Sequence, residues 1–86
     1  MQYINVHFVI YVNKFSESVL EQIKDVLTKN EITIVYLKCT EKSKQIGNTV
    51  IKIKGKHRDV TDINMVVSNL MSIESVSEVA QEMKDE

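Results

Sequence analysis

The feature that most constrains the fold is the alternation of side chains in residues 3–12, YINVHFVIYV. Successive side chains of a β-strand point to opposite faces, so a period of two predicts a strand with one buried face. The predicted buried face holds Ile4, Val6, Phe8, Ile10 and Val12, and the opposite face holds Tyr3, Asn5, His7, Val9 and Tyr11. An apolar sheet face has to be covered, so helices are expected to pack against it.

Residues 16–30 change to helical spacing. Ser16 is the expected N-cap, because its hydroxyl can accept a hydrogen bond from a free N–H of the first turn. Phe15 and Leu20 occupy the positions of a hydrophobic staple. Asn30 is expected to end the helix in the left-handed conformation. The apolar face of this helix consists of Val19, Leu20, Ile23, Val26 and Leu27.

The remaining pattern predicts a strand, a second strand, a helix and a third strand. They are expected at residues 31–40, 49–55, 57–73 and 75–80, with a hairpin loop over residues 41–48. Asp59 is the expected cap of the second helix, whose apolar face would hold Val60, Ile63, Val66, Val67, Leu70 and Met71. The order β-α-β-β-α-β predicts an α+β, ferredoxin-like fold: a four-stranded antiparallel sheet in the order 4-1-3-2 with both helices on one face.

The size of the chain fits one small domain, residues 1–80, followed by a charged tail of residues 81–86. The net charge of −1 gives no global attraction to nucleic acid or to an anionic membrane. A single cysteine, Cys39, favours a reducing, cytoplasmic compartment, and we expect it to be a partly buried strand residue. No signal-peptide pattern and no apolar run of about 20 residues is present, so we expect no membrane insertion by this chain.

Basic side chains gather on one face of the strand expected at residues 49–55. Lys52, Lys54 and Lys56 alternate there, next to His57 and Arg58. Such a strip could bind an anion or a nucleic acid, but lysines also keep an exposed sheet face soluble. RNA-recognition domains stack bases on aromatic side chains of both central strands, and this strand has none. We therefore favour a solvated face over nucleic-acid binding, with docking of a protein partner as the third alternative.

Neither metal nor catalytic signatures are present. His7, Cys39 and His57 lack the spacing of a metal site, and no nucleophile motif or phosphate-binding loop occurs. Glu17, Glu21 and Asp25 share one helical face at a spacing of four, which is typical of a solvated stripe. We therefore expect a protein that is not an enzyme and that carries no cofactor and no metal.

Two stretches resemble ACT-type regulatory domains. Residues 59–80, DVTDINMVVSNLMSIESVSEVA, resemble their final helix and strand, and residues 27–39, LTKNEITIVYLKC, resemble the end of their first helix and their second strand. The resemblance implies that a ligand would bind at the first strand-to-helix turn, here Asn13, Lys14, Phe15 and Ser16, together with a neighbouring subunit. Amino-acid-sensing members carry a glycine in that turn, whereas this chain has none and places Phe15 there.

The chain also looks like the C-terminal cytosolic domain of MgtC/SapB-family membrane proteins. The similar stretches are GNTVIKIKGK, residues 47–56, and SIESVSEV, residues 72–79. This resemblance implies a non-catalytic regulatory domain linked to magnesium homeostasis, whose membrane domain is an intramolecular partner outside this chain. The alternative is an ACT module of another host, such as a Rel-type enzyme or a stand-alone sensor. We also expect a homodimer, because an open sheet face bears Tyr3, Val9 and Tyr11 and the edge strands are free to pair. The expected partner-facing sheet surface consists of Tyr3, His7, Val9, Tyr11, Lys52, Lys54 and Lys56.

Overall fold

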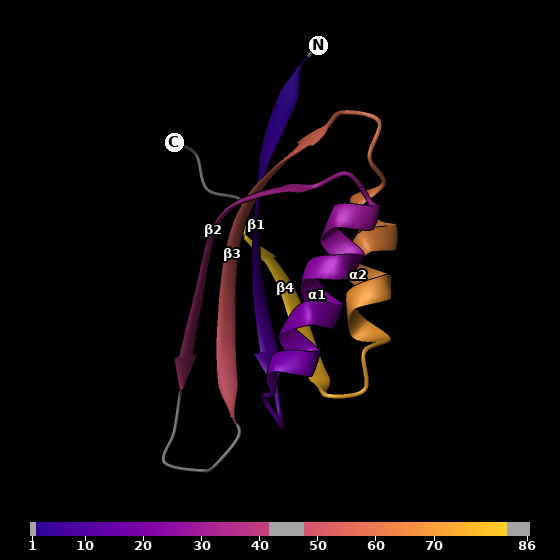
Figure 1. Cartoon of the computed structure of the whole chain (residues 1–86). Coiled ribbons are helices and arrows are strands. Elements are labelled where there is room, and N and C mark those ends of the chain that lie inside the picture. The colour runs from indigo at the N-terminus through magenta and orange to yellow at the C-terminus, as the bar shows by residue number, and fades with distance from the viewer. Residues whose placement is uncertain (1, 42–47, 83–86) are drawn as a thin grey trace.

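The computed structural model describes residues 2–41 and 48–82. Its elements follow the predicted order β-α-β-β-α-β (Figure 1). They are β1 (Tyr3–Val12), α1 (Glu17–Lys29), β2 (Thr33–Glu41), β3 (Thr49–Arg58), α2 (Ile63–Met71) and β4 (Val76–Glu82). The hairpin loop expected at residues 41–48 falls mostly on residues outside the described part of the chain.

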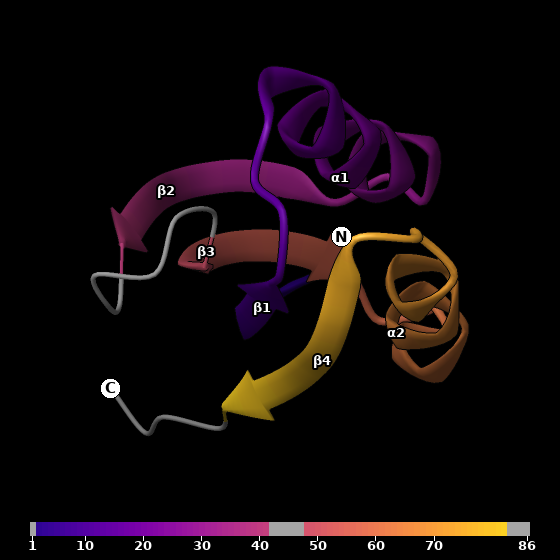
Figure 2. The ribbon, with the colours of Figure 1, turned by 90° about the horizontal axis from the view of Figure 1, so that it is seen from below.

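The four strands form one antiparallel sheet in the order β2-β3-β1-β4, which confirms the predicted order. Both helices lie against the same face of the sheet, as Figure 2 shows in a view along the strands. β1 and β3 are therefore central, and β2 and β4 are the edges. The face turned away from α1 and α2 is called the open face below.

The core lies between the helices and the sheet. Val6, Phe8, Ile10 and Val12 of β1 are almost fully buried, as the alternation predicted. Ile4, predicted on the same face, is 43% exposed, because the start of β1 extends beyond the helices (Figure 1). The helices add Val19, Ile23, Leu27, Val66 and Leu70, and the other strands and turns add Ile32, Ile51, Ile53, Ile73 and Val76. This contiguous apolar layer fixes which face of each central strand remains open.

The first helix begins as predicted and ends differently. The Ser16 hydroxyl accepts a hydrogen bond from the Val19 N–H at 3.2 Å, and Phe15 and Leu20 pack against the core. The prediction that Asn30 takes the left-handed conformation was wrong: its φ is −97°, and Glu31 has the positive φ of 60°. The Asn30 side chain donates to the Val26 carbonyl at 2.7 Å, which holds this residue on the helix and moves the reversal one position along.

The second helix begins later than predicted. Asp62, not Asp59, is its N-cap and accepts a hydrogen bond from the Met65 N–H at 3.2 Å. β3 continues through Arg58 because its last residues pair with the start of β1, so the chain turns before a helix can begin. Val60 consequently lies outside the helix and is 75% exposed, and Met71 is also exposed. β4 runs two residues beyond the expected strand, through Gln81 and Glu82.

β2 contains an irregularity that changes which side chains face the helices. Ile34 pairs with Gly55, but Tyr36 pairs with Lys54, so Val35 is the extra residue between them. A regular strand would place Tyr36 on the same face as Ile34. The extra residue instead turns Tyr36 to the open face, and Leu37 packs against the core.

Candidate binding surface

The open face is organised in rows that run across all four strands. The register places Lys54 of β3 beside His7 of β1, which lies beside Glu82 of β4. Tyr36 of β2 flanks Lys54 on the other side, and the Lys54 ammonium lies 5.8 Å from the centre of the Tyr36 ring. This row therefore runs Tyr36, Lys54, His7, Glu82. The positive charge of Lys54 and the negative charge of Glu82 thus lie on different halves of the sheet.

The next two rows continue this arrangement. One runs Lys38, Lys52, Val9, Ala80, and the other runs Thr40, Val50, Tyr11, Glu78. Val9 and Val50 are buried although they lie on the open face, since larger side chains surround them. The result is an apolar centre over β1 and β3 with charged side chains on both sides.

Charge is divided between the two halves of the open face. Basic side chains lie on β2 and β3, and acidic side chains lie on β4. We call Lys38, Lys52, Lys54 and Lys56 the basic half, and Glu78 and Glu82 the acidic margin. Two residues predicted to lie beside these lysines, His57 and Arg58, are not part of the basic half. Arg58 pairs with the exposed Tyr3 at the end of the sheet, whereas His57 faces the other way.

His57 is a buried residue of the helix-side face, 5% exposed and opposite Ile4. Its Nδ1 lies 2.7 Å from the Arg58 carbonyl oxygen. A carbonyl only accepts hydrogen bonds, so this contact assigns the proton to Nδ1. His57 is therefore a hydrogen-bonded core residue and not part of the basic surface.

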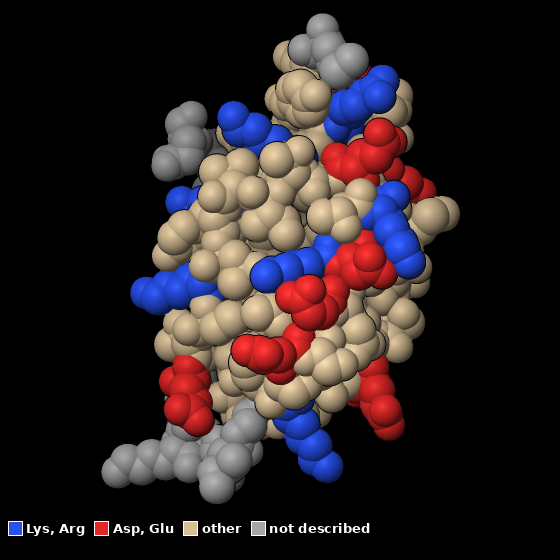
Figure 3. All heavy atoms as spheres, viewed as in Figure 1, with Lys and Arg blue, Asp and Glu red and all other residues tan. Residues whose placement is uncertain are grey.

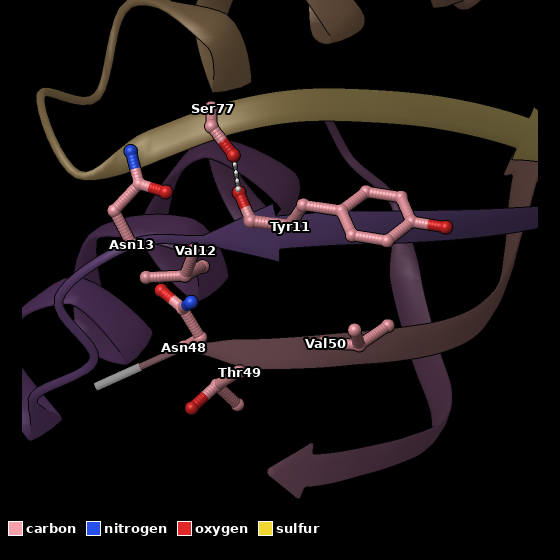
Figure 4. A pocket seen from close by; sticks show the side chains of 7 residues that line it. All are labelled: Tyr11, Val12, Asn13, Asn48, Thr49, Val50 and Ser77. Atoms are coloured by element: carbon pink, nitrogen blue, oxygen red, sulfur yellow. Dashed lines mark hydrogen bonds between the residues drawn. The ribbon is translucent and has the colours of Figure 1, made fainter. Parts of the chain in front are cut away.

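A small pocket of about 250 Å³ lies where β1 ends (Figure 4). Its lining residues are Tyr11, Val12, Asn13, Asn48, Thr49, Val50 and Ser77. The Ser77 hydroxyl donates to the Tyr11 carbonyl at 3.1 Å, and the Asn13 N–H donates to the Ser75 carbonyl at 2.9 Å. Sequence reasoning missed Asn48, Thr49 and Ser77, because only the strand register brings them beside Asn13.

The four residues of the expected ligand turn do not all line this pocket. Asn13 lines it, whereas Lys14, Phe15 and Ser16 are not among its lining residues. Ser16 caps α1, and Phe15 packs against the core. The turn between β1 and α1 therefore has a structural role in starting the helix.

Two members of the acidic stripe of α1, Glu21 and Asp25, form ion pairs along the helix surface. The Lys24 ammonium lies 3.6 Å from Glu21, and the Lys29 ammonium lies 3.0 Å from Asp25. Figure 3 shows acidic and basic side chains interleaved over this helix. Within residues 2–41 and 48–82, no three His, Cys, Asp or Glu side chains are grouped closely enough to hold a metal ion. None of the helices in that same part of the chain has the length and apolarity needed to cross a bilayer.

Cys39 is exposed, which corrects the prediction of a partly buried residue. It lies near the end of the edge strand β2, which extends beyond the helices (Figure 1). Lys38, Thr40 and Glu41 in the same segment are also exposed. Desolvation by the surrounding atoms still raises the pKa of the Cys39 thiol, and the charge of Lys24 partly opposes this shift. A raised pKa leaves less of the reactive thiolate at neutral pH.

Comparison with solved structures places the fold among ACT domains. The ACT domain of the GTP pyrophosphokinase from Chlorobium tepidum superposes with a TM-score of 0.75 at 14% identity, covering 94% of this chain and 100% of that one. The C-terminal domain of the MgtC protein from Mycobacterium tuberculosis gives a TM-score of 0.71 at 15% identity, covering 91% of this chain and 84% of that one. No protein-family model and no curated protein matches the sequence.

A third similar structure belongs to a larger enzyme. A formyltetrahydrofolate deformylase from Pseudomonas putida has a TM-score of 0.71 at 12% identity, and the match covers 96% of this chain but 29% of that one. The first two structures are single domains of a GTP pyrophosphokinase and of the MgtC protein, so in all three cases the similar fold belongs to a longer protein. The structural neighbours are ACT domains and the MgtC C-terminal domain, which confirms the resemblance drawn from the sequence.

Proposed function

We propose that this chain is a non-catalytic regulatory domain of a larger protein and that the host is a membrane protein of the MgtC type. The observation that carries the proposal is the superposition on the MgtC C-terminal domain, which extends over 91% of this chain. The domain would lie at the cytosolic face of the membrane, and its role would concern magnesium homeostasis, as the resemblance to that family implies. Magnesium sites need converging carboxylates, and residues 2–41 and 48–82 bring no such group together, so we do not assign magnesium binding to this part of the chain.

A regulatory role without catalysis agrees with the chemistry of the pocket. The lining residues that carry a hydroxyl group are Tyr11, Thr49 and Ser77, and the Ser77 hydroxyl donates to the Tyr11 backbone carbonyl. A nucleophilic serine needs a base within hydrogen-bond distance. The described lining residues include no histidine, carboxylate or lysine to take that role.

The host can be identified from the gene. The decisive experiment is to sequence the source gene upstream of the codon for Gln2 and to locate the full-length protein by cell fractionation. We expect several apolar segments of about 20 residues in frame and recovery in the membrane fraction. A catalytic domain in that position, with a protein recovered in the soluble fraction, would refute the membrane host.

The second candidate is an ACT module of an enzyme, favoured by the match to one part of a longer chain. The two candidates also differ in ligand binding. With Phe15 in the turn and no glycine, we expect no thermal stabilisation by any of the common amino acids at millimolar concentration. A rise in melting temperature with one amino acid, abolished by Asn13→Ala, would favour the enzyme module.

A further inference from the structure

The division of charge on the open face restricts how two copies of this domain can pack. Two stacked sheets related by a two-fold axis can be arranged with that axis either parallel or perpendicular to the strands. A perpendicular axis places β2 and β3 of one copy over β2 and β3 of the other. The two basic halves would then face each other, and like charges in close contact are destabilising.

A parallel axis gives the opposite result. It places β2 over β4 and β3 over β1, because the strand order is β2-β3-β1-β4. Lys38 then lies over Ala80 of the second copy, with Glu78 and Glu82 two residues to either side. Each row of residues across one sheet lies over the same row of the second copy, with the order of the strands reversed. Lys38 is thereby brought over the acidic margin of the other copy, and Lys52 and Lys54 lie over its β1, one strand away from that margin.

The centre of the face suits the same arrangement. The row Thr40, Val50, Tyr11, Glu78 places Val50 over Tyr11 of the second copy and Tyr11 over Val50. Two sheets that pack face to face keep their strands within about 30° of each other and are about 10 Å apart. Val50 is buried among its neighbours, so the contact at this centre would be made mainly by the Tyr11 ring, with charged residues at its margins as in the polar rim of a protein interface.

We infer that the open face binds the open face of a second copy, with the two-fold axis parallel to the strands. A nucleic acid would be attracted to the basic half but repelled by Glu78 and Glu82, whereas a second copy complements both. The interface consists of the basic half, the acidic margin and the central residue Tyr11, and the buried Val9 and Val50 support its centre. This inference holds whichever protein hosts the domain.

A charge-swap experiment on the full 86-residue chain tests this pairing. Two double variants are made: Lys52→Glu with Lys54→Glu, and Glu78→Lys with Glu82→Lys. Sedimentation velocity should show a dimer for the unmodified chain, and each double variant should weaken it by at least about tenfold. An equimolar mixture of the two variants should restore a dimer, because each face then meets its opposite charge.

A matched control has the same change in net charge on the other side of the molecule. Lys24→Glu with Lys29→Glu on α1 should dimerise like the unmodified chain. Circular dichroism of every variant establishes that it is folded. Raising the salt concentration should weaken the unmodified dimer, since its charges are partly exposed.

Three results on association, and one on nucleic-acid binding, would overturn the inference. The unmodified chain could remain monomeric at high concentration, or both double variants could dimerise normally, or their mixture could fail to associate. Saturable binding of a labelled single-stranded oligonucleotide by a monomeric chain, lost in the Lys52→Glu, Lys54→Glu variant, would also overturn it. That result would assign the basic half to nucleic acid.

Discussion

Gly55 of β3 lies against Ile32, so closely that a Cβ at position 55 would be 2.9 Å from the Ile32 Cγ2 atom. The same Cβ would lie 3.0 Å from the Thr33 carbonyl oxygen. Ile32 is buried directly before β2 and the other neighbour is a backbone atom, so neither is the free end of a flexible side chain. The absence of a side chain at Gly55 lets β2 enter the sheet beside β3.

Gly55→Ala should therefore destabilise the domain, because the added methyl group forces β2 away from β3. We expect a loss of about 1–3 kcal/mol in the free energy of unfolding. Urea denaturation followed by circular dichroism measures it. Ser68→Ala, at an exposed position of α2, is the control and should cost less than about 1 kcal/mol. Equal effects of the two substitutions would contradict the close contact.

Ser16→Ala should lower the free energy of unfolding by about 1 kcal/mol, because the Val19 N–H loses its acceptor. Ser18→Ala is the matched control, because Ser18 lies two residues further along in the first turn of α1 and is exposed. Its hydroxyl accepts a long hydrogen bond of 3.4 Å from Gln22, so a smaller change is expected. Thermal unfolding of both variants distinguishes a capping hydroxyl from a general effect of losing a serine.

Phe15→Ala should destabilise the domain by about 1–3 kcal/mol, less than the loss of a fully buried phenylalanine. Phe15 is half-buried and packs against the core from the turn before α1. Phe15→Leu keeps most of the apolar contact and should recover most of the stability. If both variants were as stable as the parent chain, the turn would not have the structural role assigned to it.

The Cys39 thiol should react with iodoacetamide more slowly at neutral pH than a thiol of ordinary pKa. Its raised pKa predicts that the midpoint of the rate against pH lies above that of the same residue in the unfolded chain. Lys24→Gln should move the midpoint still higher, since the charge of Lys24 lowers this pKa. Lys29→Gln is the control. A midpoint below that of the unfolded chain would show that the fold lowers the pKa of Cys39 and would contradict this prediction.

Local pattern determined most of the fold. The alternation of residues 3–12 predicted β1 with its observed bounds, and the spacing of Val19, Ile23 and Leu27 predicted the buried face of α1. The strand order followed from the right-handed connections that βαβ units require. These features are encoded in neighbouring residues, so they could be derived without knowing any long-range contact.

The position at which α2 begins was decided by pairing between distant strands. Asp59 and Asp62 can both cap a helix, and the local sequence does not separate them. β3 stays extended through Arg58 because Tyr3 pairs with Arg58 across the sheet. That contact joins residues far apart in the sequence, and it leaves Asp62 as the cap.

The open face was decided in the same way. The sequence indicated that Lys52, Lys54 and Lys56 share a face, but not what lies beside them. An extra residue at Val35 turns Tyr36 and Lys38 to that face, and the register of β4 places Glu78 and Glu82 at the opposite margin. Sequence alone thus determined the strands, the helices and their order. Strand register, which depends on packing across the whole sheet, decided how charge is divided over the surface.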